Sequence, residues 1–124
     1  MEENIDKLIT ILKEQAQIFL LDAKEFFPFG TYINKEDRIV PVGAYLGSDY
    51  SPSLMLIDLL EKDFKQGIMN GDYKIAGIAI DCVLRENNSS FDIIEMRLFE
   101  ADKEVSKRHF KYEIKEHSVD FFDV

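Results

Sequence analysis

The order of hydrophobic patterns along this 124-residue chain predicts an α+β fold. Two stretches repeat apolar residues at helical spacing, and six others are strand-like runs bounded by turn-forming segments. The last four of these follow one another through short polar turns, which is typical of an antiparallel meander. We therefore expect the element order α-β-β-α-β-β-β-β in one domain spanning residues 1–124. The six-stranded sheet should combine a hairpin with the four-stranded meander and carry both helices on one face.

The first helix is expected from about residue 3 to about residue 26. Apolar residues recur there every three or four positions, which places them along one side of a helix. They are Ile5, Leu8, Ile9, Leu12, Ala16, Phe19, Leu20 and Ala23. Acidic residues near the start are favourable because the helix dipole stabilises negative charge at that end. The pattern predicts a long helix with one buried side.

The stretch FFPFG at residues 26–30 has two interpretations. As a helix stop, Phe27 is driven out of helical geometry by the proline that follows it, and Gly30 supplies a positive φ. Phe26 is then expected to be buried against the second helix or the sheet. As a binding motif, the same aromatic residues would contact a partner. The helix stop is favoured, because aromatic runs usually belong to cores.

A hairpin should follow this stop. Strands at residues 31–34 and 38–45 flank a loop of hairpin size. Pro41 lacks the N–H that a central strand needs, so the second strand is expected at a sheet edge. Placing the hairpin beside the last strand of the meander would leave Pro41 at the outer edge.

The second helix is expected to begin after the sequence GSDYSP at residues 47–52. Ser51 is a suitable N-cap and Pro52 a suitable first helical residue. An anion site at this helix end is the alternative, and capping by Ser51 is favoured. Asn70-Gly71 should end the helix. Its buried side is expected to carry Leu56, Ile57, Leu59, Leu60, Phe64 and Ile68.

The meander strands are expected at residues 73–85, 91–100, 104–114 and 118–124. A register that keeps one face apolar pairs Leu84 with Asp92, Leu98 with Ser106, and Ile114 with Val119. Both helices should cover this face. Cys82 belongs to it and is expected to be a buried, inert thiol.

The opposite face should remain open, and its apolar residues make it the candidate interaction face. Its members are Val83, Ile93, Glu95, Arg97, Phe99, Val105, His109 and Phe122. The alternative is a solvated surface with scattered hydrophobic residues. Asp81, Glu95 and His109 would be neighbours there and could perform acid–base chemistry inside a cleft. A solvated network of ion pairs is the favoured interpretation of that group.

The sequence gives no positive indication of other chemistry. His109, His117 and Cys82 lack metal-ligand spacing, and no phosphate-binding or nucleophile motif is found, so we expect no metal, cofactor or catalytic residue. Fifteen Lys and Arg against 24 Asp and Glu give a net charge of −9, which disfavours nucleic acid and anionic membranes as partners. The N-terminal residues lack a secretion pattern, and no apolar run is long enough to span a bilayer, so we expect a cytoplasmic protein.

The sequences FFPFG at residues 26–30 and IAGIAIDCVL at 75–84, behind a long N-terminal helix, resemble those of a group of small bacterial proteins. This resemblance brings no catalytic residues with it. In its size and acidity the chain is also similar to immunity proteins, which neutralise toxins. We therefore expect a non-enzymatic, protein-binding or self-associating module of the bacterial cytoplasm. The alternatives are an immunity-type inhibitor of a basic toxin, and a small-molecule binder or enzyme that uses the open sheet face.

Overall fold

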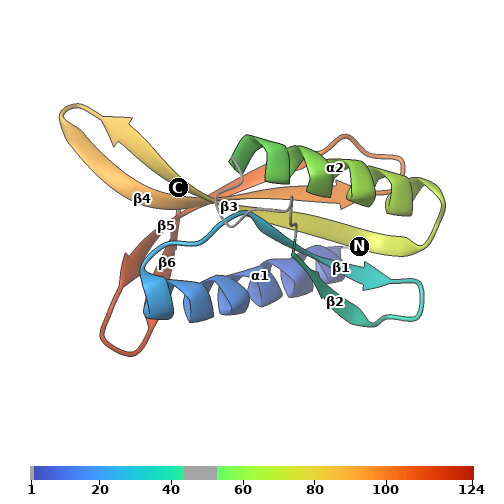
Figure 1. Ribbon diagram of the computed structural model, residues 1–124, viewed down its shortest axis with the longest axis horizontal. Helices are drawn as coiled ribbons and strands as arrows, with labels where there is room; N and C mark the ends of the chain where they lie inside the picture. Colours follow the sequence, from blue (N-terminus) through green and yellow to red (C-terminus); the bar gives the residue numbers. More distant parts are fainter. Residues whose placement is uncertain (1, 44–52) are drawn as a thin grey trace.

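The structure is a computed structural model that describes residues 2–43 and 53–124, and it confirms the predicted class and order of elements (Figure 1). Ser51, Pro52 and the rest of the GSDYSP sequence lie outside the described residues. The described elements are α1 Glu2–Ala23, β1 Phe29–Asn34, β2 Ile39–Val42, α2 Ser53–Met69, β3 Tyr73–Glu86, β4 Ser89–Glu100, β5 Ser106–Ile114 and β6 Val119–Asp123.

The six strands form one antiparallel sheet in the order β2-β1-β3-β4-β5-β6. The hairpin β1–β2 therefore lies beside β3, and its predicted place beside the last strand is wrong. The reason lies in β3, where residues 75–80 are all buried and need a neighbouring strand on each side. Pro41 is at the outer edge of the sheet, as predicted, because β2 is an edge strand.

One register differs from the prediction by a single residue. Leu84 pairs with Phe91 instead of Asp92, because the β3–β4 connection is a two-residue turn. Asn87 and Asn88 form this turn with φ values of 46° and 69°, as type I′ hairpin turns require. The predicted pairings of Leu98 with Ser106 and of Ile114 with Val119 are confirmed.

This difference places the two helices on opposite faces of the sheet, so their predicted position on one face is wrong. A shift of one residue turns every side chain of β3 to the other side relative to β4. Leu8 and Leu12 of α1 lie over Gly77 of β3. Phe64 of α2 lies over Gly30 of β1. Thr31 pairs with Gly77 and shares its face, so the adjacent Gly30 lies on the opposite face. Figure 1 shows α1 below the sheet and α2 above it.

Each face consequently has its own core. The α1 side joins Leu8, Leu12, Ala16 and Leu20 to buried residues of β1 and β3–β6. The α2 side joins Ile57, Leu60 and Phe64 to Ala76, Ile78, Ile80 and Phe99. The fold is thus a sheet buried on both sides over its central strands.

The helix ends match the prediction only for α2. Gly71 follows α2 with a φ of 82°, as expected for a C-terminal cap. In contrast, α1 ends at Ala23, before the FFPFG stretch, and Lys24 takes the left-handed conformation with a φ of 63°. Gly30 does not have the predicted positive φ, because it is a residue of β1. Phe26 is half-buried and packs against the core on the α1 side.

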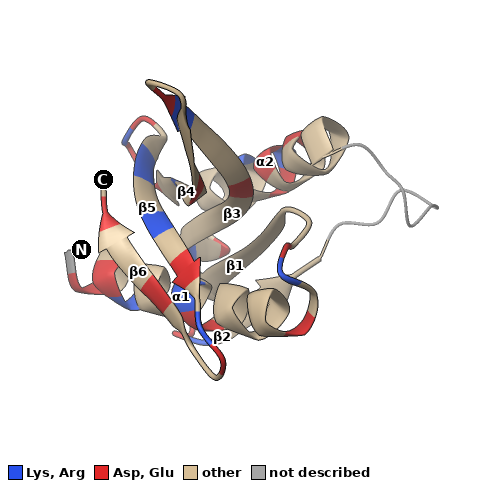
Figure 2. Ribbon diagram, turned by 90° about the vertical axis from the view of Figure 1, so that its left-hand side faces the viewer, with Lys and Arg blue, Asp and Glu red and all other residues tan. Residues whose placement is uncertain are grey.

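Charges of both signs are spread over the surface. Figure 2 shows Lys and Arg along β5 and acidic residues, all of them Asp, on the neighbouring β6. Lys13 of α1 places its Nζ 4.0 Å from the ring centre of Phe110, a favourable cation–π distance. Within residues 2–43 and 53–124, no helix has the length and apolar character needed to cross a bilayer.

Candidate functional site

Most of the predicted interaction face does lie on one side of the sheet. Ile93, Glu95, Arg97 and Phe99 alternate along β4 and point to the same side. His109 pairs with Glu95 and joins them from β5. This is the side that α2 covers, so the face is not open as predicted.

The remaining members lie elsewhere. Phe122 reaches the same side at the far strand, because it pairs with Lys111, which pairs with Ile93. Val105 precedes β5 and is partly exposed. Val83 turns to the α1 side, since the register of β3 differs from the prediction.

The two apolar members of this face on β4 are core residues. Ile93 is 7% exposed and Phe99 is 3% exposed. The Phe99 ring packs edge to face against Phe64 of α2, with ring centres 5.9 Å apart. The expectation that Phe99 is an exposed contact residue is therefore wrong, and a charge at this position would disrupt the core instead of a partner interface.

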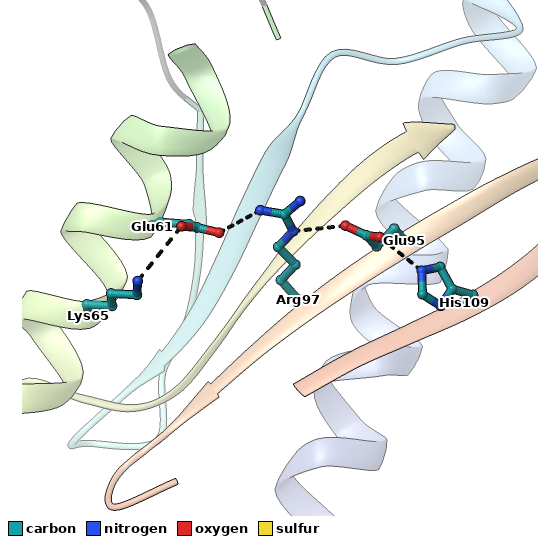
Figure 3. A network of polar contacts seen from close by, with 5 residues as sticks. All are labelled: Glu61, Lys65, Glu95, Arg97 and His109. Carbon is teal, nitrogen blue, oxygen red and sulfur yellow. Dashed lines mark hydrogen bonds and ion pairs between the residues drawn. The ribbon is translucent and has the colours of Figure 1, made fainter. Parts of the chain in front are cut away.

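The polar members form a network between α2 and the sheet (Figure 3). Arg97 donates from one guanidinium nitrogen to Glu61 of α2 at 2.7 Å, and from Nε to Glu95 at 2.8 Å. The other oxygen of Glu95 lies 2.9 Å from Nε2 of His109. Lys65 lies 3.9 Å from Glu61 at the outer end of the chain of contacts.

Electrostatics indicate that this network is structural. Burial alone would raise the pKa of Glu95, but hydrogen bonds with Arg97 and His109 outweigh it and hold that pKa below its usual value. Burial would also lower the pKa of Arg97, and its contacts with Glu95 and Glu61 raise it instead. Both groups therefore stay charged and paired. A general acid needs a pKa near the working pH, so Glu95 is poorly suited to that role.

The predicted group Asp81–Glu95–His109 is not assembled. Asp81 pairs with Ile94, whereas Glu95 pairs with Ile80, so their side chains lie on opposite faces of the sheet. Cys82 lies on the same face as Glu95 and His109, contrary to the prediction. It is half-buried, and burial raises the pKa of its thiol. No cluster of three His, Cys, Asp or Glu side chains that could hold a metal ion occurs among the described residues.

A different site is an open pocket of about 550 Å³ at the C-terminal end of α1. Residues 26–29 of the FFPFG stretch, which lead from the end of α1 into β1, form much of its wall. The rings of Phe19 and Phe26 pack edge to face on Phe29 at centre distances of 5.2 and 5.3 Å. Phe27 is 62% exposed and Phe19 is 45% exposed. The described residues around the pocket are Phe19, Asp22, Ala23, Glu25, Phe26, Phe27, Pro28, Phe29, Gly43, Ser53 and Asp81.

The polar part of this pocket is acidic. Asp22, Glu25 and Asp81 contribute carboxyl groups, and the described lining residues include no Lys, Arg or His. Asp81 accepts hydrogen bonds from the Tyr112 hydroxyl at 2.6 Å and from the Phe26 N–H at 3.3 Å. Among the described residues, none of the three carboxyl groups forms an ion pair.

Burial is the main cause that raises the pKa of Asp81. Its hydrogen bonds to Tyr112 and Phe26 act in the opposite direction, while the nearby Asp92 and Glu25 raise the pKa further. A positive charge close to Asp81 would offset the penalty that burial imposes on the ionised carboxylate. Aromatic faces beside carboxylates are also the surroundings that an organic cation prefers. The arrangement is thus suited to hold a cationic group.

The sequence indicated this pocket only through the disfavoured interpretation of FFPFG as a binding motif. Phe19, Asp22, Glu25 and the FFPFG stretch are close in the sequence, which is a signal of an acidic and aromatic segment. Asp81 was expected on the far side of the sheet because of the register error, so nothing joined it to that segment. The chain matches no protein-family model, no curated protein and no solved structure.

Proposed function

We propose that this protein is a non-enzymatic, protein-binding module of the bacterial cytoplasm that receives a basic side chain of its partner in the pocket at the end of α1. The observation that carries the proposal is the lining of the pocket: exposed phenylalanine rings, three carboxyl groups, and no basic residue among those described.

Known energetics support a cationic ligand. A guanidinium or ammonium group over an aromatic ring gains about 0.5–2 kcal/mol, more when water is excluded. Charge-assisted hydrogen bonds to carboxylates are stronger than those between neutral groups, and Arg makes them in a planar, paired geometry. The net charge of −9 would also accelerate encounter with a basic partner. Arg is the better candidate, because its flat guanidinium can stack on Phe27 while it donates to Glu25 or Asp22.

An immunity-type inhibitor of a basic toxin is one specific form of this function, and the same acidic pocket and net charge favour it. The enzyme alternative has no geometric support, because the acid–base group on which it depended is divided between the two faces of the sheet. Self-association through the pocket would require a basic segment of a second copy and is tested in the experiment below.

The test is calorimetric titration with two blocked tripeptides, one with a central arginine and one with its neutral isostere citrulline. We expect the arginine peptide to bind at least about tenfold more tightly, and its affinity to fall as salt is added. Phe27→Ser and Glu25→Gln should each weaken binding, since both side chains line the pocket. Phe122→Ser is the matched control, because Phe122 is an exposed aromatic residue outside the pocket lining.

Equal binding of the two peptides would contradict the proposal, as would unchanged binding by both pocket variants. Circular dichroism checks that each variant is folded. Sedimentation of the free protein shows whether a second copy occupies the pocket. If the wild type is a dimer and Phe27→Ser dissociates it, the ligand of the pocket is a second copy of this chain and not another protein.

A further inference from the structure

The hairpin β3–β4 extends beyond the rest of the sheet as a two-stranded arm. The pairing of β1 with β3 ends at Phe29 and Ala79, and the pairing of β4 with β5 ends at Ile93 and Lys111. Among the described strands, residues 80–86 of β3 therefore pair only with β4. Figure 1 shows the arm projecting away from β5 and β6. Within residues 2–43 and 53–124, its β3 side is thus an edge that can pair with another strand.

The turn of this arm defines which backbone groups face that edge. In a hairpin with a two-residue turn, the pair that flanks the turn is hydrogen-bonded, and bonded and non-bonded pairs then alternate. Glu86 and Ser89 flank the turn, so Leu84 and Phe91 are the next bonded pair. Val83 and Arg85 belong to non-bonded pairs, which directs their N–H and C=O groups outward.

This edge begins at the pocket. Asp81 lines the pocket and lies two residues before Val83 on the same strand. Val83 is 56% exposed and offers an apolar contact next to the outward backbone groups. Asp92 is paired with Val83 and acts electrostatically on Asp81, so it adds a negative charge beside the edge.

We propose that the outer edge of β3 from Val83 to Arg85 binds an extended basic segment of a partner protein as an added strand, with one basic side chain of that segment in the pocket. The proposal rests on the proposed function and adds the conformation of the ligand. Charge complementarity selects a segment with its basic residue at the pocket end, because Asp22, Glu25, Asp81 and Asp92 lie around the start of the edge, whereas Arg85 lies at its other end. Main-chain hydrogen bonds supply affinity in such strand addition, and alternate side chains supply specificity.

The probe is a blocked hexapeptide of alternating arginine and valine, made with a normal backbone and with N-methyl groups on either alternate set of its amides. We expect one methylated form to bind about tenfold more weakly than the unmethylated peptide and the other to bind nearly as well, because only one set of amides faces β3. Val83→Pro should cause a similar loss by removing an outward N–H, whereas Val83→Thr should not. Hydrogen exchange at the Val83 and Arg85 amides of the wild-type protein should slow when the peptide binds.

Three results would overturn the strand proposal: equal binding of the two methylated forms, unchanged exchange at Val83 and Arg85, or a stable dimer of the free protein whose exchange pattern already protects this edge. The peptide-binding and hydrogen-exchange measurements on the wild-type protein do not depend on whether Val83→Pro folds. The arginine tripeptide, which is too short to form a strand, separates the two proposals. If it binds while the methylated forms are equal, the pocket function stands and the added strand is rejected. If it fails to bind, the pocket function is rejected as well.

Discussion

At the scale of single residues, Gly30 has a role that differs from the one its sequence context predicts. A glycine after Phe-Pro-Phe was expected to supply a positive φ, yet Gly30 is an ordinary strand residue. A Cβ at this position would lie 2.5 Å from the ring of Phe64 and 3.1 Å from the carbonyl oxygen of Gly77. Glycine is therefore needed for the close approach of α2 to the sheet. The sequence could not indicate this, because the contact depends on which face α2 covers.

Gly30→Ala should lower the free energy of unfolding by roughly 1–3 kcal/mol, since the Phe64 ring must move within a packed core. The measurement is urea unfolding followed by circular dichroism. Gly43→Ala is the matched control and should be nearly neutral, because an added Cβ there meets nothing within 4 Å among the described residues. Equal unfolding midpoints for the two variants would show that α2 is not seated on Gly30.

At the scale of elements, most strands and both helices could be predicted from periodicity, whereas their packing could not. The β5 and β6 registers followed from the requirement that apolar residues share a face, and both are confirmed. For β3 that requirement does not distinguish the two registers. Residues 75–80 are all buried, so β3 presents apolar residues to both faces in either register. The deciding feature is the turn at Asn87 and Asn88, and a wider loop was expected there. A fully buried strand thus needs its turn geometry to define its register.

The β3–β4 turn should therefore be sensitive to residues that avoid positive φ. Asn88 has a φ of 69°, so Asn88→Val should lower the free energy of unfolding by about 1–3 kcal/mol. Asn88→Gly should leave it unchanged or raise it slightly, because glycine adopts this conformation freely. Thermal unfolding monitored by circular dichroism compares the two. A valine variant as stable as the glycine variant would be inconsistent with the type I′ turn.

The network that joins α2 to the sheet should make stability depend on pH. The pKa of Glu95 is lower in the folded protein than its usual value, so the unfolded chain binds more protons as the solution becomes acidic. The contribution of Glu95 is therefore complete above the unfolded pKa of about 4.3 and is lost as the pH falls through the lower folded value. Glu95→Gln should cost roughly 1–2 kcal/mol at neutral pH, and the difference from wild type should shrink in acid. Denaturant unfolding at a series of pH values measures this, and a difference that stays constant down to acid pH would argue against a paired Glu95 carboxylate.

At the scale of the whole molecule, the sheet buried on both sides explains why the predicted interaction face is not open. The covering of β4 by α2 leaves Phe99 in the core, whereas the exposed rings of Phe19 and Phe27 lie where α1 meets β1. The chain has an excess of negative charge, and the pocket concentrates three carboxyl groups beside those rings. The acidic composition is compatible with a basic partner, which the sequence offered only as the alternative of a basic toxin, and the site itself depends on contacts between α1, β1 and β3 that only the fold supplies.

The most direct test of this account locates the arginine tripeptide on the folded protein by nuclear magnetic resonance. Titration of the ¹⁵N-labelled wild type should shift amide signals of residues 19–29 and of Asp81, which surround the pocket. Signals near Phe122 should stay unchanged, and the citrulline tripeptide at the same concentration should cause much smaller shifts. If the arginine peptide shifts residues elsewhere on the protein, or if both peptides give the same shifts, the pocket is not a site for cations and the central claim fails.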